Sequence, residues 1–185
     1  MKLNAQELRT ADEDNVKEKI KNLKRKPIFF ILENIYDTYN IGGLFRLADA
    51  LTIEKMYLCG ETEIPPNSRI KKASIGTYKV VPWQYEKSVK EAIADLNSKF
   101  KIQNSGSNYR VNIVVVEQSD RSIPYTQAEY STPLALIFGN ETFGVLPETL
   151  RLANQIVEIP MWGVNKSLNV IVSAAIVSYY AVNNL

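Results

Sequence analysis

Short apolar segments alternate with segments of helical periodicity along most of this chain. The apolar segments, each expected to form a strand, lie at residues 28–32, 56–59, 80–83, 111–116, 134–138 and 156–159. They are apolar on both faces, which is typical of strands in a sheet that helices cover on both sides. Strands that alternate with helices form parallel sheets. The sequence therefore predicts an α/β fold, with a parallel sheet covered by helices on both faces.

Helices are predicted around these strands at residues 4–25, 41–51, 86–100, 147–153 and 168–182, with a polar turn at 103–108. Asn40 is placed to cap the second helix, because an asparagine side chain accepts hydrogen bonds from first-turn amides. Pro82 lacks an amide donor and places the strand at 80–83 near an edge of the sheet. The last helix is apolar on nearly every side, whereas a surface helix of a monomer keeps a polar face. We expect helix 168–182 either to be deeply buried or to pack on a partner subunit.

The chain has no histidine and one cysteine, Cys59. A Ser-His-Asp triad, a Cys-His pair and an HExxH zinc site are therefore excluded. Proton transfer near neutral pH must come from other side chains or from the substrate. A lone cysteine forms no intrachain disulfide, so we expect a reducing, cytoplasmic location. No apolar run reaches the roughly 18 residues of a membrane helix, and we expect neither a membrane nor a metal partner.

A net charge of +2 conceals an uneven distribution, because residues 17–26 alone carry a local charge of +5. We divide the chain into a basic helical arm, residues 1–26, and a main domain, residues 27–185. Two interpretations of the basic residues are open. They form either solvated helix faces or patches that contact phosphates. The second interpretation makes six residues candidate RNA contacts. They are Lys24, Arg25, Lys26, Arg69, Lys71 and Lys72.

Five of the eight glycines lie in three short segments, each after a predicted strand. They are Gly42, Gly43, Gly139, Gly144 and Gly163. Ordinary tight turns are one explanation. The other is a ligand site, because ligands of open α/β sheets bind beyond the carboxyl ends of the strands and glycine allows a close backbone approach. We expect one small-molecule site there. The sequence has neither GxGxxG nor GxxxxGK[ST], which argues against Rossmann-type enzymes and P-loop ATPases.

Three segments resemble, in order, the motifs of the SpoU/TrmH family of RNA ribose 2′-O-methyltransferases, which belongs to the SPOUT class. They are residues 40–50 (NIGGLFRLADA), 137–145 (IFGNETFGV) and 159–170 (IPMWGVNKSLNV). Residues 70–76 also resemble the Lys-rich segment that the family often has between its first two motifs. Leu47 departs from the threonine that is frequent at its position, which concerns helix packing more than chemistry. The resemblance extends from residue 30 to about residue 182.

The resemblance implies an S-adenosyl-L-methionine (AdoMet)-dependent enzyme that methylates a ribose 2′-hydroxyl of tRNA or rRNA. It also implies a deep trefoil knot near the C-terminus, and a homodimer in which the partner completes each active site. Helix 168–182 would belong to the dimer interface. The implied catalytic residues are Arg46, Asn40, Glu141, Ser167 and Asn169. The implied cofactor-binding residues are Phe138, Gly139, Asn140, Gly144, Ile159, Met161, Ser167 and Leu168, and no metal is implied.

Two roles are open for Arg46. It is either the base that accepts the hydroxyl proton, or a group that binds the adjacent phosphate and stabilises the developing alkoxide. The first role is chemically awkward because a guanidinium is almost never deprotonated. We expect Glu141 to accept a hydrogen bond from Asn169 or Arg46. The alternative functions are a catalytically inactive knotted RNA-binding module and another AdoMet- or nucleotide-using α/β enzyme.

Overall fold

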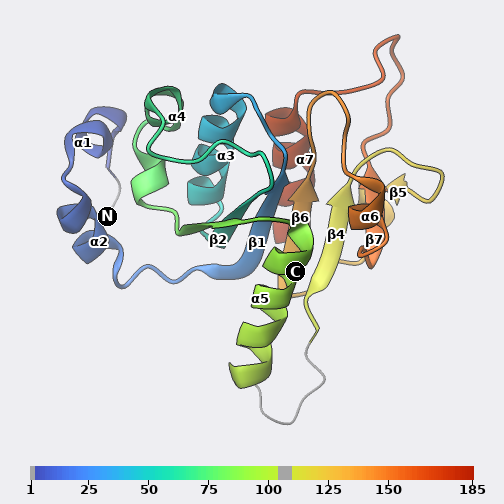
Figure 1. Cartoon of the computed structure of the whole chain (residues 1–185), viewed down its shortest axis with the longest axis horizontal. Helices are drawn as coiled ribbons and strands as arrows, with labels where there is room; N and C mark the ends of the chain where they lie inside the picture. Colours follow the sequence, from blue (N-terminus) through green and yellow to red (C-terminus); the bar gives the residue numbers. More distant parts are fainter. Residues whose placement is uncertain (1–2, 104–109) are drawn as a thin grey trace.

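The computed structural model describes residues 3–103 and 110–185 of the chain (Figure 1). Within this part, one parallel sheet has the strand order β3-β2-β1-β6-β4-β7-β5. The strands are β1 (Lys26–Glu33), β2 (Ile53–Cys59), β3 (Trp83–Glu86), β4 (Asn112–Val116), β5 (Ile123–Pro124), β6 (Leu134–Phe138) and β7 (Gln155–Glu158). The predicted parallel sheet is confirmed. β6 is the central strand of the sheet. It lies between β1 and β4, although it follows both of them in sequence.

Helices cover both faces of the sheet, as predicted (Figure 1). They are α1 (Ala5–Thr10), α2 (Glu13–Ile20), α3 (Thr38–Ala50), α4 (Ser68–Ser74), α5 (Val89–Gln103), α6 (Pro147–Leu150) and α7 (Val170–Asn183). One core forms between the sheet, α3 and α7, and contains Phe30, Phe45 and Phe138. A second core forms between the opposite face and α5. In the described ranges, no helix is long and apolar enough to cross a membrane.

The structure corrects several predicted boundaries. The helix predicted at 4–25 is two helices, because Ala11 is extended and Asp12 caps α2 by accepting a hydrogen bond from the Asp14 amide. The strand predicted at 80–83 begins only at Trp83, although it does lie at an edge of the sheet. The short elements α4 and β5 were not predicted, since neither segment has a clear apolar period. The predicted turn at 103–108 lies almost entirely outside the described residues.

The N-terminal helices pack on the main domain. Val16 in α2 is completely buried, and Lys79 Nζ donates a hydrogen bond of 2.8 Å to the carbonyl of Ala11. Arg25, whose contact with RNA stays a prediction, donates hydrogen bonds to the carbonyls of Ile53 at 3.0 Å and Val80 at 2.7 Å. Partial burial lowers the pKa of its guanidinium. Arg25 directly precedes β1, and its side chain reaches the two carbonyls from there.

Replacing Arg25 with alanine is expected to lower the free energy of unfolding by about 1.5–3 kcal/mol, because hydrogen bonds from a charged donor contribute about that much. The exposed neighbour Lys24 supplies a matched control. Its replacement with alanine should change stability by no more than about 0.5 kcal/mol. Urea denaturation of both variants checks this expectation. Equal stability of the two variants would show that the Arg25 contacts contribute nothing.

Candidate active site

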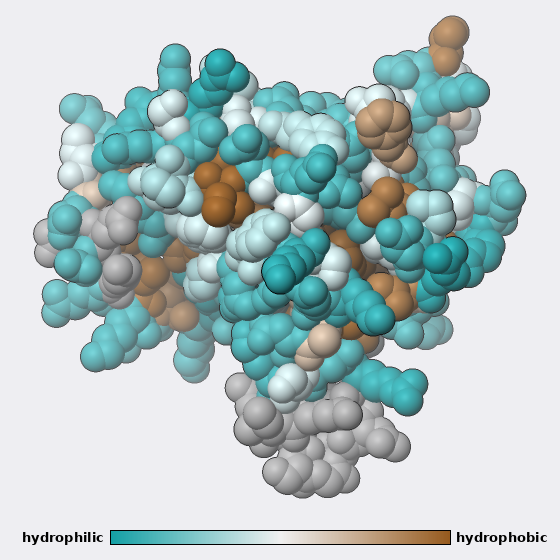
Figure 2. All heavy atoms as spheres, viewed as in Figure 1, coloured by the Kyte–Doolittle hydropathy of each residue, from teal (hydrophilic) through white to brown (hydrophobic). Residues whose placement is uncertain are grey.

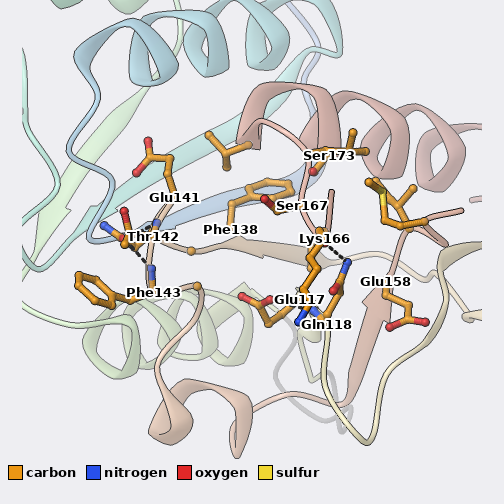
Figure 3. A pocket seen from close by; sticks show the side chains of 18 of the residues that line it. Glu117, Gln118, Phe138, Glu141, Thr142, Phe143, Glu158, Lys166, Ser167 and Ser173 are labelled. Carbon is orange, nitrogen blue, oxygen red and sulfur yellow. Dashed lines mark hydrogen bonds between the residues drawn. The ribbon is translucent and has the colours of Figure 1, made fainter. Parts of the chain in front are cut away.

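A cavity of about 330 Å³ opens beyond the carboxyl ends of β4, β6 and β7 (Figure 3). Of the three glycine segments expected to build one small-molecule site, only that of Gly139 and Gly144 lines this cavity, whereas Gly42 and Gly43 lie within α3, close to Ala73 and Ile171. The cavity lining includes all eight predicted cofactor-binding residues, which are Phe138, Gly139, Asn140, Gly144, Ile159, Met161, Ser167 and Leu168. Gly163, by contrast, has no other residue within 4 Å of an added Cβ and does not line the cavity. The structure therefore brings the second and third motifs together, and cofactor binding by these residues stays a prediction.

The loop after β6 is held in a tight turn. Asn140 and Gly144 exchange two backbone hydrogen bonds of 3.1 and 2.9 Å. The Asn140 side chain accepts hydrogen bonds from the amides of Thr142 and Phe143, and donates one of 2.7 Å to the Asn34 carbonyl. A Cβ on Gly139 would lie 2.5 Å from backbone atoms of the 144–145 segment. Glycine is thus required at this position for the loop to fold back against the cavity.

Two carboxylates that sequence reasoning did not single out hold this loop. Glu117, after β4, accepts a hydrogen bond of 2.8 Å from the Val145 amide. Glu33, at the end of β1, is 4% exposed and accepts hydrogen bonds from the Leu146 amide at 2.8 Å and the Thr149 hydroxyl at 2.5 Å. Each is an acidic residue that ends an apolar strand, and this signal is visible in the sequence.

The buried Glu33 predicts a pH dependence of stability. Burial raises the pKa of its carboxyl above the ordinary value of 4.5, so the folded protein binds this proton more tightly than the unfolded chain. The contribution of Glu33 to stability therefore falls as pH rises from about 4.5 to the raised pKa, and is constant above it. We expect Glu33→Gln to remove this decline. Urea denaturation across this pH range, with Glu129→Gln at an exposed carboxylate as control, measures it. An unchanged pH profile in Glu33→Gln would contradict the assignment.

Residues of the three motifs meet beside the cavity in a chain of hydrogen bonds. Asn40 Nδ2 donates to Glu141 Oε1 at 2.8 Å, and Asn169 Nδ2 donates to Asn40 Oδ1 at 3.0 Å. Asn40 does not cap α3 as predicted, because the helix begins earlier and Asp37 caps it. The partner of Glu141 is Asn40, and not Asn169 or Arg46. Asn40 is buried between the other two side chains and links them.

Arg46 lies apart from this group. It is on the exposed face of α3 and does not line the cavity. No hydrogen bond or ion pair joins it to another residue of the described ranges. Ser167 lines the cavity, and Asn169 caps α7 by accepting a hydrogen bond of 2.8 Å from the Ile171 amide. A single chain therefore brings together four of the five predicted catalytic residues, and leaves Arg46 facing outward.

The cavity fits AdoMet in its chemistry. Phe138, Ile159 and Leu168 supply apolar surface for an adenosyl group, and the loop after β6 brings backbone atoms to the lining. Its ionisable lining residues are three glutamates and one lysine, which together leave two negative charges. AdoMet has two positive groups, a sulfonium and an ammonium, and one negative carboxylate. Its net charge is therefore positive, opposite to the net negative charge of the cavity lining. Among the described residues, no group of three or more acidic or cysteine side chains is placed to hold a metal ion.

The fold and the cavity together define a parallel α/β protein with a ligand site at the carboxyl ends of its central strands. The sequence profile of the SpoU rRNA methylase family matches residues 27–179. This match covers most of the chain, and the chain belongs to that family.

Curated relatives agree with this membership. The tRNA (guanosine(18)-2′-O)-methyltransferase of Escherichia coli is 26% identical over 162 residues, which cover 85% of this chain and 64% of that protein. The protein of the same name from Thermus thermophilus is 28% identical over 159 residues, which cover 85% of this chain and 76% of the relative. The chain thus spans slightly less than two thirds of the E. coli relative.

Solved structures share the fold. The SpoU methyltransferase AviRb from Streptomyces viridochromogenes, in complex with AdoMet, superposes with a TM-score of 0.76 at 22% identity, over 87% of this chain and 58% of that one. The TrmH/SpoU tRNA modifying enzyme of A. aeolicus gives a TM-score of 0.72 at 24% identity, over 92% of this chain and 84% of that one.

Proposed function

We propose that this protein transfers a methyl group from AdoMet to a ribose 2′-hydroxyl of tRNA or rRNA. The hydrogen-bonded chain Glu141–Asn40–Asn169 carries the proposal, because it joins the three motifs at the edge of a cavity that suits AdoMet. The named activities of the curated relatives, which are guanosine 2′-O-methyltransferases of tRNA, support the same reaction.

Each group has a distinct role in this reaction. AdoMet, when bound, supplies the methyl group. Phe138, Ile159 and Leu168 would hold its adenosyl group, and the tight loop after β6 would line the same site with backbone atoms. Glu141 and Asn169 hold Asn40 in place. Arg46 binds a neighbouring phosphate and stabilises the oxygen as its proton leaves, because a guanidinium remains charged and is a poor base. The proton passes to a phosphate oxygen or to water.

A homodimer is part of this proposal. Val172 and Tyr179 leave apolar surface exposed along α7, so this helix is not buried on all sides, and Leu168 adds to this surface just before the helix begins. The segment before it projects from the body and exposes Trp162 and Val164 (Figure 1), and Figure 2 shows hydrophobic atoms at its tip. Exposed apolar patches of this kind mark interaction sites. In this dimer the partner's Arg46 completes this chain's cavity, which the exposed position of Arg46 outside the cavity of its own chain supports.

Two finer features complete the proposal. The first is a deep trefoil knot near the C-terminus, which the insertion of β6 between β1 and β4 and the family membership support. An experimental chain trace from β6 to α7 tests it. The second is a cytoplasmic location, which the free thiol of the buried Cys59 supports.

Calorimetry and RNA mapping test the function itself. Titration with AdoMet and with its product S-adenosylhomocysteine should show binding of both to the purified protein. Mapping of 2′-O-methyl groups in total RNA should reveal a position that loses methylation when the gene is deleted and regains it when the gene is restored. Failure of both compounds to bind at millimolar concentration would overturn the proposal.

A further inference from the structure

A second cavity, of about 290 Å³, lies between α1, α4 and the turn Thr77–Lys79. Its lining consists of Arg9, Ser68, Lys71, Lys72, Gly76, Tyr78 and Lys79. Four of these seven residues are cationic and none is acidic. Within the described ranges, no ion pair neutralises Arg9, Lys71 or Lys72. A concave site with this lining attracts anions, because like charges held close together are stabilised by a counter-charge.

The packing of α1 on the main domain creates this cavity. Gly76 has a φ of +89°, and a Cβ there would lie 2.6 Å from the carbonyl oxygen of Leu8. Lys79 fixes the end of α1 through its hydrogen bond to Ala11. These contacts bring Arg9 to the same cavity as Lys71 and Lys72, which are more than 60 positions away in sequence. Figure 1 shows α1 at one end of the molecule, near α4.

A neighbouring cavity shares a residue with this one, and its wall includes the residue before Asn40 in sequence. Ser68 lines both cavities, and the wall of the neighbouring cavity, of about 300 Å³, includes Tyr36, Tyr39 and Arg69. Tyr39 directly precedes Asn40, the central residue of the hydrogen-bonded chain. The two tyrosines are 47% and 55% exposed, so their rings are available for stacking on bases. Asp37 and Glu63 also line this neighbouring cavity, and such carboxylates repel phosphates but accept hydrogen bonds from base amino groups.

We propose that the cationic cavity binds phosphate groups of the RNA substrate, at nucleotides away from the methylated ribose. The strand passes over Tyr36 and Tyr39, and its phosphates then reach Arg9, Lys71, Lys72 and Lys79. RNA is favoured over a small anion because the two cavities are adjacent, and a polymer with alternating bases and phosphates fits both. This inference rests on the proposed function, and it adds Arg9, Lys79 and the tyrosines to the basic residues expected from the sequence.

Salt-dependent RNA binding tests the proposal. The triple variant Arg9→Gln/Lys71→Gln/Lys72→Gln should bind bulk tRNA at least about tenfold more weakly than the wild type. The slope of log affinity against log salt concentration should decrease by about 2, since each lost phosphate contact removes about 0.7–0.9 from it. The matched control, Lys87→Gln/Lys90→Gln/Arg151→Gln, removes three exposed charges elsewhere and should leave the slope within about 0.5 of the wild-type value.

The readouts separate this proposal from the proposed function. AdoMet affinity, measured by calorimetry, and thermal unfolding should be unchanged in both triple variants. A wild-type protein that binds neither AdoMet nor RNA would overturn the function. An active wild type, together with an unchanged salt slope in the Arg9/Lys71/Lys72 variant, would overturn only the phosphate site. Loss of pyrophosphate binding in that variant, with RNA binding intact, would identify a small-anion site and also overturn the inference.

Discussion

Replacing Arg46 with alanine is expected to reduce kcat for RNA methylation by about 10²–10³, because removal of one transition-state donor has an effect of that size. AdoMet affinity and stability should not change, since Arg46 is exposed and lies outside the cavity of its own chain. Arg46→Lys should recover little activity, because an ammonium group lacks the planar pair of donors that binds phosphate. Steady-state kinetics and calorimetry on folded variants measure these effects. An unchanged kcat in Arg46→Ala would remove Arg46 from the reaction.

A mixing experiment shows whether Arg46 acts on the partner's cavity. At an AdoMet concentration well below the wild-type Kd, Arg46→Ala and Gly139→Ala chains alone are each expected to keep no more than about 3% of wild-type activity. In a mixed dimer, one site would combine an intact cavity with the partner's intact Arg46. Random mixing in equal amounts should therefore restore about a quarter of wild-type activity, because half of the dimers are mixed and each has one working site. If the mixture regains no methylation activity, the cavity and the arginine act within one chain.

The substitution Gly139→Ala is expected to weaken AdoMet binding by at least about 30-fold, which corresponds to about 2 kcal/mol. The added methyl group would lie 2.5 Å from backbone atoms of the 144–145 segment, which cannot rotate away as a side chain can. The loop must therefore shift, and with it the backbone that lines the cavity. Calorimetric titration with AdoMet measures the loss.

Gly163→Ala is the matched control for this prediction. A Cβ at Gly163 meets no other residue within 4 Å. The same chemical change should therefore alter AdoMet affinity by no more than about threefold, which corresponds to a change in binding free energy of less than about 1 kcal/mol. Thermal unfolding of both variants separates a local change from a loss of fold. Equal AdoMet affinity in the two variants would show that the loop after β6 does not shape the cofactor site.

Strand positions were predictable because the central strands are buried on both faces and contain few polar residues. Five of the six predicted segments overlap the observed strands closely, and the exception, 80–83, meets β3 only at Trp83. Helix ends were less predictable, since a cap depends on which of several polar residues reaches the first-turn amides. Asp37 takes that role in α3, and this releases Asn40 to bond Glu141.

The cavity residues were predictable from the family resemblance, and the glycine segment after β6 marked their place, but the contacts that hold them were not predictable. Glu33 and Glu117 end two strands that are far apart in sequence from the loop they bind. Whether a carboxylate at a strand end binds water or a distant amide depends on the order of strands in the sheet. Here β6 lies between β1 and β4, so both carboxylates reach the loop that follows it.

The sequence alone determined the parallel α/β class, the glycine loop after β6 and the candidate motifs, because these depend on local periodicity and residue type. The tertiary structure alone decided which polar groups meet. It placed Asn40 between Glu141 and Asn169, turned Arg25 toward two backbone carbonyls, left Arg46 facing outward and brought Arg9 to Lys71 and Lys72. Such contacts join residues distant in sequence, and they form only when the packing of strands and helices has set the distance between them.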